Sequence, residues 1–189
     1  MWQVRLVVAL GLCLVVASAV LAQQEKWYEL NQKATELRQE GKYGEATRIA
    51  EQALDVAEKT FGPDSADVAY SLNGLALLYM RQEKYADAEA LLKRSLAIWE
   101  KTRGPDDPGV ATALSDLALL YMRQGKYAEA EPLLKRSLAI RENTRGPDDP
   151  AVAYCLKNLA ALYTKTGKQE EASKLEERAQ KIKSQSGSH

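Results

Sequence analysis

The chain has 189 residues, which suits one domain, and its 26 basic residues balance 26 acidic residues. Because the net charge is zero and only 7% of the residues are aromatic, we expect no attraction to nucleic acid and no surface for stacking bases. The only histidine, His189, is the last residue, and no glycine-rich phosphate-binding loop occurs in the sequence. We therefore predict neither an enzyme nor a metal or cofactor site.

Residues 1–22 have the layout of a secretory signal peptide. Arg5 precedes an uncharged run over residues 6–21 that ends in small side chains. Cleavage is predicted after Ala22 or, as a second possibility, after Ala19, and it would place the protein outside the cell or in the periplasm. The alternative is an uncleaved membrane anchor, although the run is shorter than the roughly 20 apolar residues that a spanning helix needs. With the signal removed, we expect no stable membrane insertion.

A repeated pattern organises the rest of the chain. The stretch L-S-D-L-A-L-L-Y-M-R-Q-G-K-Y-A-E-A, residues 114–130, returns 42 residues away on both sides, and a less regular copy lies at residues 30–46. Apolar residues within each copy recur at helical spacing. We predict four units of two helices, at about residues 25–66, 67–108, 109–150 and 151–183, and a disordered tail over residues 184–189.

Local signals mark where these helices begin and end. Asp149 and Pro150 suit an N-cap followed by proline at the first helical position. Glycine followed by proline ends the second helix of the first three units. These second helices are predicted to begin near Tyr43, Tyr85 and Tyr127. Glu83 stands where the other units have glycine at the turn between their two helices, which indicates that this turn does not need a positive φ.

The apolar faces predict how the units pack. Alanines at fixed places in each unit let paired helices approach closely, but a single pair cannot bury such a face and stacked neighbours can. Lys33, Glu176 and Gln180 replace leucines at the two ends of the array, as terminal repeats require for solubility. The predicted fold class is therefore an all-α solenoid of four antiparallel helix pairs. Cys155, the only cysteine after cleavage, aligns with Ser71 and Ala113 and is expected to be a small packed residue.

The spacing of these packing residues resembles the tetratricopeptide repeat signature. The residues that carry the resemblance are Leu114, Leu117, Ala118, Tyr121, Gly125, Tyr127 and Ala130. The 42-residue period and the G-P-D-D-P connector are similar to the kinesin light chain-like branch, over about residues 25–183. The resemblance implies a right-handed superhelix whose concave groove binds extended peptides. The chain lacks the long heptad-repeat segment that attaches kinesin light chains to a motor, so the resemblance extends to the fold and the mode of binding.

By the geometry of that family, the outward side of each first helix forms the groove. It would present aromatic, apolar, amide and hydroxyl groups, and its charges are all basic. The predicted groove residues are Tyr28, Asn31, Arg38, Tyr70, Asn73, Leu77, Met80, Arg81, Ser115, Leu119, Met122, Arg123, Tyr154, Lys157 and Lys165, with Thr35, Thr112, Ala161 and Thr164 among them. We expect an acidic, partly apolar peptide or protein loop as partner. The competing interpretation is an ordinary solvated helix face.

Two further alternatives concern the rest of the surface. Trp99 aligns with Ala57 and Arg141, so the pattern does not place it in the core; it could form a convex contact or, as we favour, lie over the neighbouring loop. The whole protein could instead be an architectural subunit of an envelope or secretion-related complex. Because the end faces are polar, we expect a monomer.

Overall fold

The computed structural model describes the backbone of residues 2–186 and the side chains of residues 18–185. This part of the chain forms eight helices and no strand. The helices are α1 (Trp2–Gln39), α2 (Tyr43–Phe61), α3 (Ala66–Arg81), α4 (Tyr85–Arg103), α5 (Pro108–Arg123), α6 (Tyr127–Arg145), α7 (Pro150–Lys165) and α8 (Gln169–Ser186). The three predicted tyrosine starts of the second helices are confirmed.

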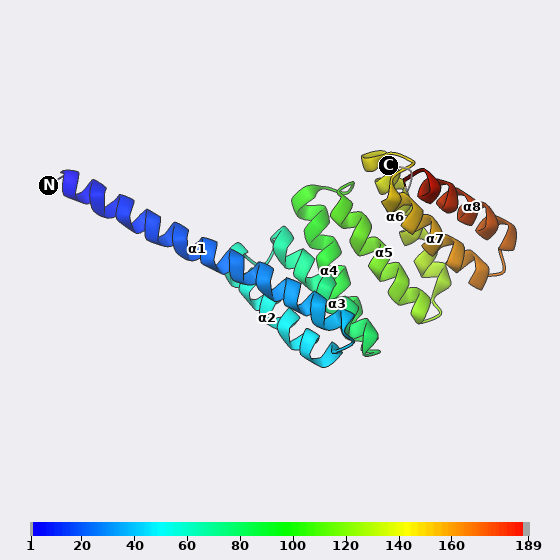
Figure 1. Ribbon diagram of the computed structural model, residues 1–189, viewed down its shortest axis with the longest axis horizontal. Helices are drawn as coiled ribbons and strands as arrows, with labels where there is room; N and C mark the ends of the chain where they lie inside the picture. The colour runs from blue at the N-terminus through cyan, green and yellow to red at the C-terminus, as the bar shows by residue number, and fades with distance from the viewer. Residues whose placement is uncertain (1, 187–189) are drawn as a thin grey trace.

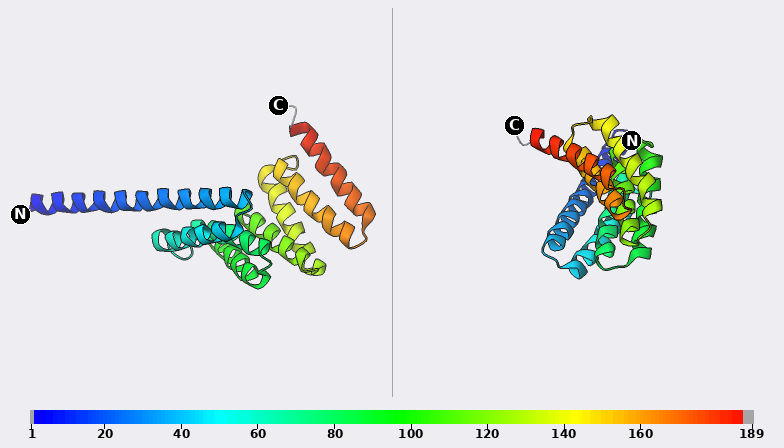
Figure 2. Two further views of the ribbon diagram at one scale, coloured as in Figure 1. Left: turned by 60° about the horizontal axis from the view of Figure 1, so that its bottom comes forward. Right: turned by 90° about the vertical axis from the view of Figure 1, so that its right-hand side faces the viewer.

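The helices form four consecutive pairs, as Figure 1 shows. Each helix packs against the next one in the chain, and the first helices α1, α3, α5 and α7 also contact one another in series. The turns within pairs lie along one edge of the array, and the connectors between pairs lie along the opposite edge (Figures 1 and 2). The predicted all-α solenoid of four helix pairs is confirmed.

Both ends of the described backbone, residues 2 and 186, belong to long helices. α1 is continuous from Trp2 to Gln39 and runs through both predicted cleavage sites, and its N-terminal half projects beyond the other helices (Figure 1). The side chains of residues 1–17 lie outside the described residues, as do residues 187–189 of the predicted tail, whereas α8 continues to Ser186. Within the described residues, no helix combines the length and the apolar character needed to cross a membrane.

Alanine and leucine at repeated positions fill the core. Ala76, Ala118 and Ala160 in the first helices are buried to within 1% of full burial, which lets the backbones of adjacent helices approach closely. The fully buried leucines occupy equivalent places in successive units: Leu72, Leu114 and Leu156; Leu78, Leu120 and Leu162; and, in the second helices, Leu92 and Leu134. Cys155 is fully buried, with its Sγ 3.5 Å from Ser137 Oγ, so the prediction of a packed residue is confirmed.

The predicted caps are present. Asp107 and Asp149 each accept a hydrogen bond of 2.7 Å from a backbone N–H of the first turn, and proline follows each of them at the first helical position. Ser65 performs the same role for α3 by accepting from Val68 N at 3.3 Å. The connectors therefore both stop one helix and start the next.

The expectation for the turn at Glu83 is wrong. Glu83 has a φ of 59°, close to the 75° of its equivalent Gly125, so the same left-handed conformation occurs without glycine. The hydrogen bonds explain why: Lys84 N donates to Tyr79 O at 3.0 Å, as Lys126 N donates to Tyr121 O at 2.9 Å. This bond closes the end of the first helix and requires the positive φ whatever the side chain.

A recurring arginine joins neighbouring units. Arg136 donates from Nη2 to the carbonyl oxygen of Pro105 at 3.1 Å and pairs through Nη1 with Glu100 at 2.7 Å. Equivalent arginines, Arg94 and Arg178, contact Pro63 and Pro147 in the same way. Each connector is thus held against the second helix of the following unit, which limits the rotation of one pair against the next.

A candidate peptide-binding cavity between the first helices

A cavity of about 380 Å³ lies between α1, α3 and α5; we call it the central cavity. Its lining comes from the three first helices, from Ala50 of α2, and from the C-terminal parts of α4 and α6. The residues are Asn31, Ala34, Thr35, Arg38, Ala50, Tyr70, Ser71, Asn73, Gly74, Leu77, Leu78, Trp99, Pro108, Gly109, Thr112, Asp116, Arg141 and Arg145. The cavity is large enough for one or two side chains of a peptide.

The structure brings some of the predicted groove residues together at the central cavity. Asn31 and Arg38 of α1 and Tyr70, Asn73 and Leu77 of α3 line it. They enter it because α1 and α3 contact each other directly at the start of the array.

Other predicted residues lie in the core or close to it. Met80 is 4% exposed and packs with Leu117 and Leu120 of the next first helix, and Ser115 is 1% exposed. Leu119 and Met122 are partly buried against the same core. The reason is that consecutive first helices contact one another, so part of the face that sequence assigned to the groove is covered by the neighbouring unit. In this structure Met80 and Ser115 offer no surface to a ligand.

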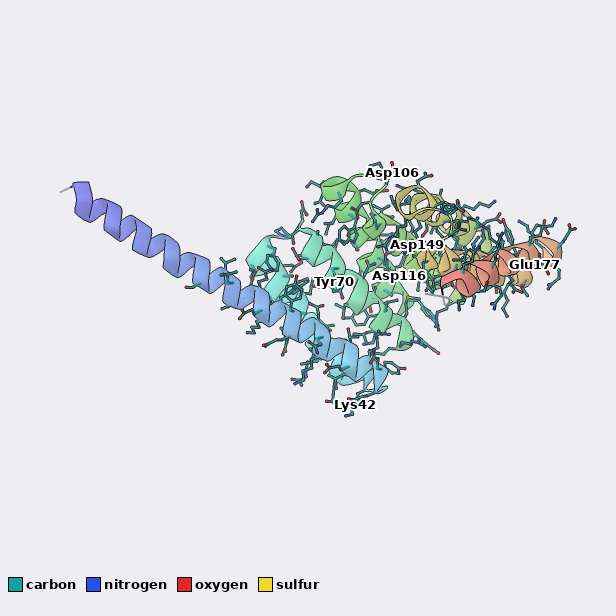
Figure 3. All side chains as sticks on the ribbon, turned by 45° about the horizontal axis from the view of Figure 1, so that its top comes forward. Lys42, Tyr70, Asp106, Asp116, Asp149 and Glu177 are labelled. Atoms are coloured by element: carbon teal, nitrogen blue, oxygen red, sulfur yellow. The ribbon has the colours of Figure 1, made fainter. Side chains whose placement is uncertain are left out.

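The remaining predicted residues are exposed and lie outside the lining of the central cavity. Arg81, Arg123, Tyr154 and Lys165 are exposed. Lys157 lines a separate hollow of about 550 Å³ together with Glu176, Glu177 and Gln180 of α8, and the neighbouring Lys183 ammonium lowers the pKa of Lys157. Glu177 is labelled at that end of the array in Figure 3.

An aromatic group marks the N-terminal end of the cavity. Trp27 is 5% exposed and donates from Nε1 to Ser71 Oγ at 2.8 Å, which joins α1 to α3. Its ring makes edge contacts with Tyr28 and Tyr70, at centroid distances of 4.8 and 5.9 Å. Tyr28 and Tyr70 are more than half exposed and line a neighbouring hollow of about 660 Å³. A buried indole thus holds two exposed tyrosines at the cavity mouth.

Polar groups form the other wall. Asn73 and Asp116 are each 8% exposed, and Asn73 Nδ2 donates to Asp116 Oδ2 at 3.1 Å across the contact between α3 and α5. Arg141 Nη2 donates to Thr112 Oγ1 at 3.1 Å. Burial raises the pKa of Asp116 to about 7, although the nearby Arg141 guanidinium and the Asn73 hydrogen bond act in the opposite direction. Figure 3 labels Tyr70 and Asp116 on the two helices that face this wall.

Sequence reasoning missed the residues that second helices contribute. Trp99, Arg141 and Arg145 line the cavity, although second helices were expected to lie outside the groove. Trp99 packs against the first turn of α5, where Gly109 has no side chain to obstruct it, and not over a loop as we favoured. The repeat itself contained a signal for this position. Ala57, Trp99 and Arg141 are equivalent residues of successive units, and a packing position of the repeat would not vary so much in size and charge.

No metal-binding cluster of three or more His, Cys, Asp or Glu side chains occurs in the part of the chain that the structure describes. What the cavity offers is hydrogen bonding, positive charge and aromatic surface. These are the means of recognising a polypeptide.

Comparisons with known proteins agree with the repeat pattern. A tetratricopeptide repeat family model matches three overlapping segments, residues 23–97, 67–143 and 109–185. A comparison with curated proteins finds no match.

Several solved structures have a similar fold. BtubC (BKLC) from P. vanneervenii is 26% identical with a TM-score of 0.74; the match covers 85% of this chain but only 64% of that one, so this chain spans less than two thirds of its length. A putative kinesin light chain with nearly identical TPR-like repeats, from Podosopora anserina, is 25% identical with a TM-score of 0.66, covering 86% of this chain and 77% of that one. Aspartyl phosphate phosphatase F from Bacillus subtilis has a TM-score of 0.75 at 16% identity, covering 87% and 42%, which shows a shared fold alone.

The family matches cover residues 23–185 and include every helix pair. Arrays of this kind are scaffolds for protein–protein interaction and typically have no catalytic activity of their own. The chain belongs to the tetratricopeptide repeat family and is similar to its kinesin light chain-like members.

Proposed function

We propose that this protein binds an extended, acidic and partly apolar peptide segment of a partner protein along its first helices, outside the cytoplasm. The observation that carries the proposal is the composition of the central cavity. Three arginines, Arg38, Arg141 and Arg145, line it with a single acidic residue, Asp116. Such an excess of cations favours carboxylates of a ligand.

The rest of the lining suits the other parts of a peptide. Leu77 and the rings of Tyr70 and Trp99 give apolar contact area, while Asn31 and Asn73 carry amides that can pair with a peptide backbone. Exposed Arg81 and Arg123, at the C-terminal ends of α3 and α5, would extend the positive charge beyond the cavity. The competing interpretation is that these arginines belong to an ordinary solvated helix face. It predicts that reversing their charge does not change the binding of a partner.

Affinity capture from the native compartment tests this proposal. We expect Arg81→Glu/Arg123→Glu and, separately, Arg38→Glu to lose most of the captured partner, because reversal repels an acidic ligand. The matched control is Arg48→Glu/Lys181→Glu, which reverses two exposed charges on the second helices α2 and α8. Capture that is the same for both double variants would leave the solvated-face interpretation standing.

The proposed location rests on the layout of residues 1–22. Mass spectrometry of the N-terminus of the protein made in its native host distinguishes the possibilities. A mature chain that begins at Gln23 or at Val20 supports cleavage and a periplasmic or secreted protein. An intact N-terminus in the membrane fraction would instead support the anchor.

The alternative function is an architectural subunit with no specificity in the groove. The polar residues at both ends of the array argue against end-to-end assembly, since Lys33, Glu176 and Gln180 are all exposed. We expect a monomer in light scattering of the purified protein. A stable oligomer, together with an amount of captured partner that is unchanged in the groove variants, would favour the architectural role.

A further inference from the structure

Tyr28 and Tyr70 occupy equivalent positions of the first two units, and their side chains are open to solvent. Tyr28 is 58% exposed and Tyr70 is 55% exposed. The third unit has threonine, Thr112, at the same position. The helix pairs therefore pack without an aromatic ring at this place, and the two exposed rings are available to a ligand.

Trp27 fixes the orientation of both rings. Its own side chain is 5% exposed, its Nε1 donates to Ser71 Oγ at 2.8 Å, and its ring makes edge contacts with both tyrosines. Because the indole is buried and hydrogen-bonded, the tyrosine rings are held in place before a ligand arrives, which lowers the entropic cost of binding. The other units have buried alanines in place of the tryptophan: Ala69, Ala111 and Ala153.

The hollow beside these rings differs in charge from the central cavity. Apart from the aromatic rings, α1 contributes amide and hydroxyl side chains to its lining and one charged residue, Glu36, which accepts a hydrogen bond from Gln32 Nε2 at 2.9 Å. None of the residues that line this hollow is basic, whereas three arginines line the central cavity. An uncharged stretch of ligand is therefore favoured here over an acidic one.

The two spaces are continuous. Asn31 and Thr35 of α1 and Tyr70 of α3 line both the hollow and the central cavity. One extended ligand can therefore occupy both, with an acidic part beside the arginines and an uncharged part beside the tyrosines.

The separation of the rings matches one turn of a polyproline II helix. The centroids of Tyr28 and Tyr70 lie 4.8 and 5.9 Å from that of Trp27. The two tyrosine rings are therefore within about 11 Å of each other, and a polyproline II helix advances about 9 Å in one turn of three residues. Two prolines three positions apart can thus each meet one ring. Proline has no N–H, so such a segment needs donors for its carbonyl oxygens, and the tyrosine hydroxyls can supply them.

We propose that Tyr28 and Tyr70, held by Trp27, bind an uncharged, proline-rich stretch of the partner next to the acidic stretch in the central cavity. The proposal rests on the peptide-binding function proposed above and names a second part of the same ligand. A polyproline II segment loses little conformational freedom on binding, which suits an open hollow lined by aromatic rings. Aromatic rings also stack on sugars, but the continuity with the central cavity favours a polypeptide over a polysaccharide.

The test titrates acetyl-hexaproline amide against the full chain and follows the Trp27 indole N–H by NMR. The comparison peptide is acetyl-(Gly-Ser)3-amide, which is equally uncharged but flexible. We expect hexaproline to bind at least about tenfold more tightly, because the flexible peptide must be ordered on binding. Its affinity should be the same in about 0.05 M and about 0.5 M NaCl, since no ion pair forms.

Three alanine variants and one phenylalanine variant localise the site. Tyr28→Ala and Tyr70→Ala should each weaken the binding of hexaproline about threefold to tenfold, because each removes one ring. Tyr28→Phe keeps the ring and should retain more of the affinity than Tyr28→Ala. The matched control is Tyr154→Ala, which removes the equivalent tyrosine of the last unit, 49% exposed, and should leave the affinity unchanged. Because all three tyrosines are about half exposed or more, the variants should stay folded, and circular dichroism checks this.

The proposal is overturned if hexaproline fails to bind at tens of millimolar, if the Gly-Ser peptide binds as tightly, or if Tyr154→Ala weakens binding as much as Tyr28→Ala. Binding of cellohexaose at these tyrosines without binding of hexaproline would replace the peptide by a polysaccharide.

These outcomes differ from a failure of the proposed function. Partner capture that depends on Arg81 and Arg123, with no binding of hexaproline, would keep the groove and remove the proline-binding hollow. Binding of hexaproline that depends on Tyr28 and Tyr70, with capture insensitive to those arginines, would instead keep the hollow and remove the acidic ligand.

Discussion

The indole ring of Trp99 lies on the backbone of Gly109 so closely that a Cβ at Gly109 would come within 2.5 Å of Trp99 Cδ2. The ring belongs to α4 and the glycine to the first turn of α5, so the contact joins two consecutive units. The equivalent pairs are Ala57 with Asp67 and Arg141 with Ala151. Tryptophan, the largest of these three second-helix residues, is thus paired with glycine, the smallest of the three first-helix residues. Trp99 and Gly109 together form one wall of the central cavity.

Gly109→Ala should destabilise the protein by about 1–3 kcal/mol, because the added methyl group overlaps the ring and either Trp99 or the α5 backbone must move. Urea unfolding followed by far-UV circular dichroism measures the change. Gly74→Ala is the control: Gly74 lies inside α3, nothing stands within 4 Å of its missing Cβ, and alanine should gain about 0.5–1 kcal/mol. If Trp99→Ala does not relieve the cost of Gly109→Ala in a double-mutant cycle, the ring is not its cause.

Exchanging residues between two equivalent turns isolates the cost of a left-handed side chain. Glu83 has a φ of 59° and Gly125 a φ of 75°, and nothing lies within 4 Å of a Cβ at Gly125, so the backbone conformation is the main difference. Glu83→Gly should stabilise the protein by up to about 1 kcal/mol, and Gly125→Glu should destabilise it by about 1–2 kcal/mol. Thermal unfolding of both variants checks the signs. Opposite signs, or no change in either variant, would mean that the turn relaxes when its residue changes.

The fold could be predicted from the sequence because the same packing residues recur in successive units. Tyrosine, alanine and leucine at a fixed period identify the helix pairs, and the glycine–proline connectors identify their ends. Contacts between units were harder to foresee. Asn73 with Asp116, Trp99 with Gly109 and Arg141 with Thr112 each depend on how one pair is rotated against the next, and a period of 42 residues does not specify that angle.

The unknown rotation between units also explains why the predicted groove residues differ from those that line the central cavity. Residues such as Met80 and Ser115 share a helix side with the groove positions, but the following unit covers them. Arg141 and Arg145 belong to a second helix, yet the stacking turns the end of α6 toward the cavity. A helical face read from one unit is therefore a good guide to the core and a weaker guide to the surface between units.

Removal of one connector aspartate should cost stability, whereas removal of its neighbour should not. Asp149 Oδ1 accepts from Ala151 N at 2.7 Å and caps α7, while Asp148 is exposed. We expect Asp149→Ala to destabilise the protein by about 1 kcal/mol and Asp148→Ala to change it by no more than about 0.5 kcal/mol. Urea midpoints compare the two directly. Equal effects would indicate that the connector charges, and not the cap, are what matters. Figure 3 labels Asp149 and also Asp106, which is the equivalent of Asp148 in the preceding connector.

Glu131 should give the protein an acid-sensitive component of stability. Its carboxylate accepts from Lys168 Nζ at 3.0 Å and from Tyr163 Oη at 3.1 Å, and it pairs with Lys135 Nζ at 2.7 Å. The Lys135 hydrogen bond, followed by that of Lys168, lowers the pKa of Glu131 from its ordinary value of 4.5 to about 2. Because the folded pKa is the lower one, this stabilisation is fully present above about pH 4.5 and disappears as the pH falls toward about 2.

Glu131→Gln removes the charge and keeps the shape, so it isolates this component. With the side chain 22% exposed and partly screened by solvent, we expect a loss of about 1 kcal/mol at neutral pH. The difference between wild type and variant should shrink through the window from about pH 4.5 to about pH 2 when unfolding by urea is measured along a pH series. Glu29→Gln, at an exposed position of α1, serves as the control and should show no such trend. A difference that stays constant down to about pH 2 would mean that packing of the Tyr163 and Lys168 side chains, and not the charge of Glu131, holds α6 to α7 at this point.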